Sequence, residues 1–250
     1  MKRFLSSCAR LPRVVISIGL GLTAFATLCH TAAYAGIVLT TPSGVAPGGT
    51  FRFIGVTATT TDAAGWSTYT NWDNFVNDVT NTYGGVTYEG QAVTGWLPVV
   101  GVGTTNPRDH IGGFGTNVPF YMQNGTRVAS SATTSSGGLW SGSLQSGINR
   151  TLDGTQKINN AVWTNSNTNG TINQSGFSWD YGPGVMTGKS GQSSGQWLFN
   201  ALNGVGSNNN YVYTVSPVLT APVPEPSTCA MALAGLACGG YSLFRRRNAR

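Results

Sequence analysis

The central part of the chain, from residue 36 to residue 224, contains no cysteine and very little charge. All four cysteines lie in the terminal segments, which excludes a disulfide framework for the central part. Charged residues make up 9% of the whole chain, and Glu89 is the single glutamate of the central part. A glycoside hydrolase needs paired carboxylates at a fixed separation. The shortage of glutamate therefore weighs against a hydrolase that acts on polymer.

The positive charge of the chain belongs to its two ends. The formal net charge is +6, but eight of the 14 bases lie in the first 13 residues and the last six. Between residues 36 and 224 there are six bases and seven acids. Such a near-neutral segment has no basic stripe to neutralise phosphates, so we expect no nucleic-acid partner.

The central part shows no specific catalytic motif. Its single histidine, His110, follows Asp109, and a triad would require a distant serine to meet this pair. We interpret His110 as a surface-loop residue. There is no HExxH or CxxC motif, and GPGVMTGKS has Pro183 where a phosphate-binding loop requires glycine. We therefore expect no catalytic residue and no cofactor.

Calcium is the metal that the composition leaves open. Four aspartates could supply the hard oxygen ligands that calcium prefers, namely Asp62, Asp73, Asp153 and Asp180. No loop concentrates several acids, so we interpret them as solvated surface carboxylates and expect no metal site.

The first 35 residues have the pattern of an export signal. Basic residues end at Arg13, an apolar stretch covers residues 14–29, and Ala33 and Ala35 supply the small residues of a cleavage site. We expect the general export machinery and signal peptidase to act here, with the cut after Ala35. A retained transmembrane helix is the alternative.

The C-terminal segment has three parts: a proline-rich motif at 223–228, an apolar stretch at 229–244 and a basic end at 245–250. As a helix, the 16 residues of the apolar stretch would span about 24 Å, slightly less than a hydrocarbon core of ~30 Å. The following arginines would stay on the cytoplasmic side. The physics alone indicates a marginal membrane anchor, with a soluble helical hairpin as the alternative.

The order of these parts closely resembles the PEP-CTERM sorting signal of Gram-negative bacteria. The resemblance implies processing by an exosortase, a membrane-embedded protease, after transient anchoring in the inner membrane. It also implies delivery to the cell surface or to an extracellular polysaccharide matrix. The residues that carry it are Val223, Pro224, Glu225, Pro226, Ser227, Arg245, Arg246 and Arg247.

Residues 36–220 form the predicted cargo, between a signal peptide at 1–35 and a sorting signal at 221–250. This segment is rich in Gly, Ser, Thr and Asn, which is typical of disorder, but it also contains all seven tryptophans. About 185 residues suffice for one compact domain. We therefore expect one folded exported domain with long polar loops.

The hydrophobic pattern predicts an α+β domain with a mainly antiparallel sheet and one or two helices. Apolar residues in TNWDNFVNDVTNTYGG recur at helical spacing, and a shorter helix is expected around Trp140. Asn124-Gly125 is typical of a hairpin turn. Strands are predicted in TFRFIGVTAT, YEGQAVTGWLPVVGV, VPFYMQNGTRV, NAVWTNSN, GQWLFNA and NNYVYTVSPVL.

The order of these segments resembles the endostatin-like branch of the C-type lectin-like fold. In that branch a strand, a tryptophan-bearing helix and a second strand follow one another in the same way, usually with disulfides that this chain lacks. A β-sandwich is the alternative. The matching residues are Val118, Pro119, Trp140, Asp153, Gly154, Val162, Trp163 and Gly170.

Trp179, Asp180 and Tyr181 lie together in GFSWDYGPG, a stretch bounded by glycine and proline, and are the candidate ligand-binding residues. Trp66, Tyr69 and Trp96 are further candidates for a sugar platform, although core packing is the usual place for such rings. We expect a non-enzymatic adhesion or polysaccharide-binding protein of the cell surface or matrix. A secreted hydrolase is the alternative.

Overall fold

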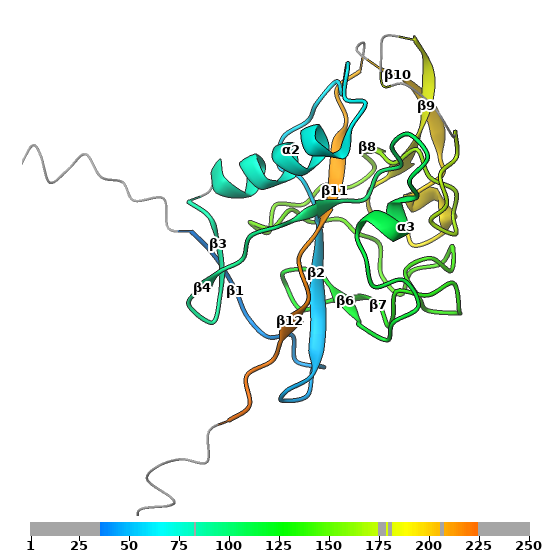
Figure 1. Cartoon of the computed structure of the whole chain (residues 1–250). Coiled ribbons are helices and arrows are strands. Elements are labelled where there is room, and N and C mark those ends of the chain that lie inside the picture. Colours follow the sequence, from blue (N-terminus) through cyan, green and yellow to red (C-terminus); the bar gives the residue numbers. More distant parts are fainter. Residues whose placement is uncertain (1–35, 83, 175–178, 180–181, 206–207, 225–250) are drawn as a thin grey trace, which may run out of the picture. The chain divides into compact units, whose positions relative to one another are not determined.

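The computed structural model describes residues 36–82, 84–174, 179, 182–205 and 208–224 (Figure 1). The chain divides into two compact units between Ala35 and Gly36, and the described residues all belong to the second unit. The predicted signal peptide, with Ala33 and Ala35, lies outside the described residues, as do residues 225–250 of the predicted sorting signal. Signal cleavage therefore stays a prediction.

The described residues form mostly sheet, with few helices. Most strand pairings are antiparallel, and the parallel ones are β1–β3, β8–β11 and β2–β6. In chain order the elements are β1 (Ile37–Leu39), β2 (Thr50–Val56), α2 (Tyr69–Thr82), β3 (Val86–Tyr88), β4 (Gln91–Ala92), β5 (Leu97–Pro98), α3 (Pro107–His110), β6 (Phe120–Tyr121), β7 (Arg127–Ala129), β8 (Ala161–Trp163), β9 (Gly182–Lys189), the 3₁₀ helix η1 (Gly195–Trp197), β10 (Ala201–Val205), β11 (Tyr211–Val215) and β12 (Leu219–Thr220).

Within the described part of the chain, the strands form a three-stranded sheet and a nine-stranded sheet. The small sheet has the order β1-β3-β4, and the large one runs β10-β9-β8-β11-β2-β6-β7, with β12 paired to β2 and β5 to β11. β2 and β11 therefore lie side by side in the middle of the large sheet (Figure 1).

The large sheet has a hydrophobic core on each face, because successive side chains of a strand point to opposite faces. From β2, Phe51 and Phe53 join one buried cluster, whereas Ile54 and Val56 join the other. The first cluster includes side chains of α2. The second includes side chains of η1 and of the long segment between β7 and β8. β2 is consequently buried along nearly all of its length.

α2 confirms the predicted helix, with a shift in its buried side. Trp72, Val76 and Thr80, at intervals of four residues, are fully buried. Phe75 and Val79, which belong to the same predicted stripe, are only half-buried. The helix is therefore rotated so that one edge of its apolar stripe faces outward.

The hairpin at Asn124-Gly125 is also confirmed. β6 and β7 pair antiparallel, and the Gly125 N–H donates to the Met122 carbonyl over 2.9 Å. Gly125 has φ +81°, a left-handed conformation that glycine adopts without a steric penalty.

Two expectations about local structure are wrong, and one strand was not predicted. The segment around Trp140 consists of turns and bends, not a helix, because glycines at 137, 138 and 142 interrupt it. GQWLFNA begins as the 3₁₀ helix η1 and joins a strand only at Ala201. GPGVMTGK, in which no strand was predicted, forms β9, where the lack of a side chain on Gly188 allows close packing against the Trp197 carbonyl.

No helix among the described residues is long and apolar enough to cross a membrane. The predicted hydrophobic segment at 229–244 lies outside that part of the chain. The assignment to the C-type lectin-like fold stays a prediction.

Arg52, on β2, is a buried cation that ties distant segments together. Its guanidinium donates to the carbonyls of Ser216 and Ile111, each over 2.7 Å, and to that of Gly112 over 3.3 Å. Burial lowers the pKa of Arg52 to about 10. These bonds fix the segment after α3 and the segment after β11 to the centre of the sheet.

Replacing Arg52 by alanine is expected to lower the free energy of unfolding by ~2–3 kcal/mol, since buried carbonyls lose charged donors. Arg127→Ala is the matched control, because Arg127 is exposed and bonds only the Gln145 side chain; it should change stability by less than about 0.5 kcal/mol. Urea unfolding of the purified protein measures both. Equal effects of the two substitutions would contradict the role of Arg52.

Candidate functional site

A shallow, open groove of about 300 Å³ lies along the outer side of α2. Two aromatic rings, two amides and one carboxylate line it: Trp66, Phe75, Asn71, Asn74 and Asp78. Another cavity, between α2, β2 and residues 151–153, has a volume of about 10 Å³ and has room for one water molecule at most. The groove is the better candidate for a ligand.

The helix period of α2 places four of the five groove residues in one row. Residues 71, 74, 75 and 78 have the spacing i, i+3, i+4 and i+7, so their side chains share one side of the helix. Trp72, Val76 and Thr80 occupy the buried side. The packing that anchors α2 on the sheet therefore also orients the groove residues outward.

Trp66 reaches the groove from the turn that precedes α2. Its ring packs edge to face on Trp72, with centroids 5.0 Å apart, and lies tilted against Phe75 at 5.3 Å. The Trp66 carbonyl accepts a hydrogen bond of 3.1 Å from Trp72 Nε1. The indole of Trp66 is thus held in place before any ligand arrives.

Exposure separates Trp66 from the other tryptophans. Trp66 is partly buried, whereas the other six are fully buried, namely Trp72, Trp96, Trp140, Trp163, Trp179 and Trp197. Of the aromatic residues considered as sugar platforms, Trp96 and Trp179 are therefore core residues. Trp66 is the tryptophan with a ring accessible beside polar side chains.

The structure places Trp179 in the core and not at an exposed loop position. Its ring lies between those of Trp72 and Trp163, with centroid distances of 4.6 and 5.6 Å. The expectation that the Trp179 ring contacts a ligand is therefore wrong. Asp180 and Tyr181 lie outside the described residues, and a role for them stays a prediction.

A second polar cluster connects α2 to α3. The rings of Tyr69 and His110 are stacked, with centroids 3.5 Å apart and an interplanar angle of 13°. His110 Nε2 lies 2.8 Å from Asp73 Oδ1, and both side chains are partly buried. The sequence pointed to Asp109 as the neighbour of His110, but the partner is Asp73, 37 positions earlier in the chain.

The Tyr69 hydroxyl donates to the carbonyl of Val100 over 2.8 Å and to that of Thr105 over 3.2 Å. Burial raises the pKa of Tyr69 well above its usual value, and the nearby charges of Asp73 and Asp109 raise it further. The hydroxyl therefore stays protonated at neutral pH. Tyr69 is a donor that fixes the loop after β5, and not a base.

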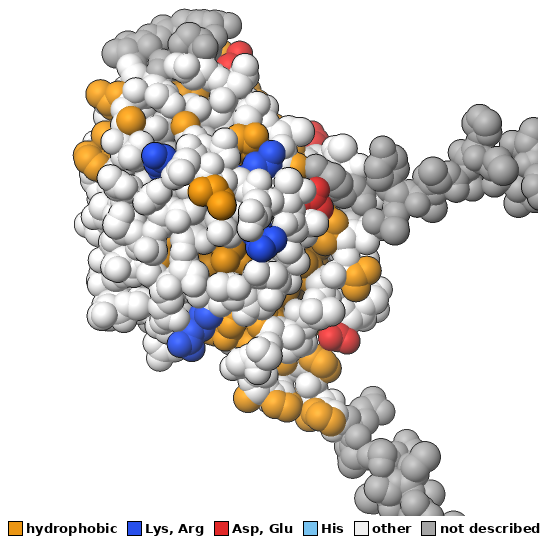
Figure 2. All heavy atoms as spheres, turned by 180° about the vertical axis from the view of Figure 1, so that it is seen from behind, with side chains coloured by type: hydrophobic (Ala, Val, Ile, Leu, Met, Phe, Trp, Pro, Cys, Tyr) orange, Lys and Arg blue, Asp and Glu red, His pale blue; other side chains and the backbone are white. Residues whose placement is uncertain are grey.

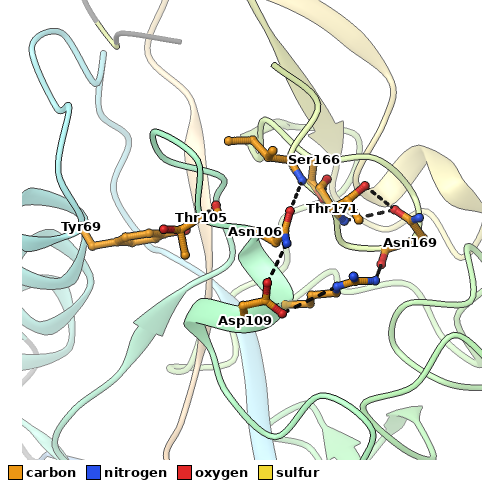
Figure 3. Close-up of polar contacts among 9 residues, drawn as sticks. Tyr69, Thr105, Asn106, Asp109, Ser166, Asn169 and Thr171 are labelled. Atoms are coloured by element: carbon orange, nitrogen blue, oxygen red, sulfur yellow. Dashed lines mark hydrogen bonds and ion pairs between the residues drawn. The ribbon is translucent and has the colours of Figure 1, made fainter. Parts of the chain in front are cut away.

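Figure 3 shows how the neighbouring polar side chains bond to one another. The Asn106 amide donates to Asp109 Oδ2 over 2.6 Å, and its oxygen accepts the Ile172 N–H over 2.9 Å. Asn169 Oδ1 accepts from the Thr171 hydroxyl and N–H, over 2.7 and 3.1 Å. This network connects α3 to the loop that follows β8, and we interpret it as a scaffold.

The His110–Asp73 pair resembles two of the three members of a catalytic triad, but no hydroxyl among the described residues hydrogen-bonds the His110 ring. Likewise, no group of three or more His, Cys, Asp or Glu side chains in the described ranges could hold a metal ion. The carboxylate of Asp153, one of the aspartates considered as calcium ligands, accepts hydrogen bonds from Thr151 and Thr155. Burial alone would raise the pKa of Asp153, but these bonds outweigh it and lower the pKa.

One face of the domain carries scattered charges. Figure 2 shows one face of the domain, on which Lys and Arg side chains are scattered among polar, uncharged ones. No basic stripe is visible on that face. This agrees with the near-neutral composition of the central part of the chain.

Residues 222–247 match the PEP-CTERM protein-sorting motif, which confirms the motif expected from Val223 onward. The motif marks the chain as an exported protein that is sorted by exosortase, a membrane protease, toward the cell surface. Among curated proteins, no relative matches this chain.

Replacing Asp73 by alanine removes the half-buried hydrogen bond to His110 and should lower the free energy of unfolding by ~1 kcal/mol. Asp78→Ala is the control, because it removes an exposed carboxylate from the same helix and should cost less than about 0.5 kcal/mol. Urea unfolding at neutral pH compares the two. The interpretation fails if Asp78→Ala is as destabilising as Asp73→Ala.

Proposed function

We propose that this protein is a non-enzymatic component of the cell surface or extracellular matrix whose exported domain binds polysaccharide. The sorting motif at residues 222–247 supports the delivery. The groove along α2 supports the binding, and the partly exposed ring of Trp66 beside polar side chains is the observation that carries the proposal.

The groove combines the two kinds of contact that a sugar requires. The faces of pyranose rings are apolar and pack on aromatic rings, which Trp66 and Phe75 supply. The amides of Asn71 and Asn74 and the carboxylate of Asp78 offer donors and acceptors for hydroxyl groups. Because Trp66 is already fixed on Trp72, little conformational entropy is lost when a sugar binds.

The local charge favours a polysaccharide without acidic groups. Asp78 lines the groove, Asp73 lies on the same helix, and the sequence has no Lys or Arg between Arg52 and Arg108. A uronic acid in the groove would therefore meet a like charge without a compensating cation. Neutral sugar chains avoid this repulsion.

Trp66→Ala should weaken binding to a neutral polysaccharide about tenfold or more, because a central aromatic contact is lost. Phe199→Ala is the control, since Phe199 is an exposed aromatic residue outside the groove. Affinity electrophoresis of the exported protein in gels that contain soluble neutral glucans or mannans measures the change. Equal binding by wild type and Trp66→Ala would refute the groove, and release of reducing ends from these polymers would favour the alternative, a hydrolase.

Asp78→Asn tests the role of charge. The substitution keeps hydrogen-bonding capacity but removes the negative charge, so binding to acidic polymers such as alginate should become stronger, by about two- to tenfold. Binding to neutral polymers should change little. Increasing salt should reduce the difference between wild type and variant on alginate. If wild type already prefers alginate to neutral polymers, the assigned sugar class is wrong.

A further inference from the structure

The last strand of the domain continues almost to the sorting motif. In β12, Leu219 and Thr220 pair with Phe51 and Thr50 of β2. The next residue, Ala221, is 2% exposed and continues this pairing through both its N–H and its carbonyl. Its N–H donates to the Gly49 carbonyl over 2.8 Å, and its carbonyl accepts from the Gly48 N–H over 3.0 Å. The matched sorting motif begins at the very next residue, Pro222.

This geometry limits how far the motif can lie from the folded domain. A fully extended chain spans at most ~3.6 Å per residue, so Glu225 lies within about 14 Å of Ala221. The predicted hydrophobic segment begins at Cys229, within about 29 Å of Ala221 by the same measure. A protease that cuts near Pro-Glu-Pro at the bilayer must therefore work directly against this end of the domain while β12 stays paired.

The surface at this end is partly apolar, and Glu89 lies at its edge, where its carboxylate accepts a hydrogen bond of 3.5 Å from Thr41 Oγ1. Residues 40–51 and 217–224, which form the turns around β12, contain no charged side chain. Val218 and Val223 are 51% and 65% exposed, and Val223 lies next to Gly48. Figure 2 shows hydrophobic side chains gathered where the chain leaves the described part of the domain, at the bottom of the view. Burying the apolar part of this surface requires no desolvation of ions.

We infer that this end of the domain is a docking surface for the exosortase-type membrane protease that processes the tail. The surface consists of β12, Ala221, the turn at 42–49 and the exposed side chains of Val218 and Val223. Docking holds the sorting motif at a fixed distance from the protease, so that recognition uses the folded cargo as well as the motif. Two features single out this occupant: the short reach of the chain and the exposed apolar side chains beside the motif.

The first test changes the distance between the domain and the motif. A neutral Gly-Ser insert of about ten residues between Ala221 and Pro222 leaves the fold and the motif intact but separates them by up to ~36 Å. Docking predicts slower removal of the tail from the full chain in a host that contains its exosortase. Pulse-chase labelling and mass spectrometry of the product measure the rate. Faster or unchanged processing would overturn the inference, since it would mean that the folded domain is an obstacle or has no influence.

The second test places a charge on the surface at the native distance. Val218→Lys should slow processing by about tenfold, because docking would bury an unpaired ammonium group. Leu202→Lys is the control: Leu202 is 59% exposed on β10, far from β12 in Figure 1. Urea unfolding of both purified variants shows that they are folded. If the two variants are processed equally fast, the surface does not dock the protease.

Discussion

Packing of tryptophan rings is the interaction on which the rest of this structure depends. Trp66, Trp72, Trp179 and Trp163 form a continuous series of ring contacts from the groove into the core beside β8. Trp72 bonds the Trp66 carbonyl, and Trp163 bonds that of Thr61, so the series also fixes the turn that leads to α2. Such rings bury large apolar areas, and the indole N–H groups of Trp72 and Trp163 still find carbonyl acceptors, which suits a domain with few charges.

The scarcity of charge affects stability and function together. With 9% charged residues, the chain relies on hydrogen bonds between uncharged groups, and its long loops are held by Asn, Ser and Thr side chains. Charged groups also contribute, as in the bonds of the buried Arg52 guanidinium to backbone carbonyls and the contact of Asp73 with His110. On a surface with few ions, binding depends mainly on complementary shape and on hydrogen bonds to the hydroxyl groups of a ligand. Both the groove at α2 and the partly apolar end at β12 are surfaces of this kind.

Local patterns predicted the elements that local forces determine. The stripe in α2, the alternation in β2 and the Asn124-Gly125 turn each depend on residues close in sequence, and each prediction was correct. β9 was missed because glycine and proline disfavour strands, whereas its neighbours β8 and β10 supply the pairing. The helix predicted around Trp140 does not form. The prediction followed the apolar residues and gave too little weight to the surrounding glycines, which favour turns.

By itself, the sequence determined that the protein is exported and sorted toward the cell surface, because a sorting motif is read as a linear segment and needs no neighbours. It also determined the near-neutral character of the cargo and the position of its main helix. Only the tertiary structure decided that Trp66 is accessible while Trp179 is buried, that Asp73 meets His110, and that Ala221 remains in the ladder with Gly49. Each of these depends on contacts between residues far apart in the chain, and the topology of the sheet sets which of them meet.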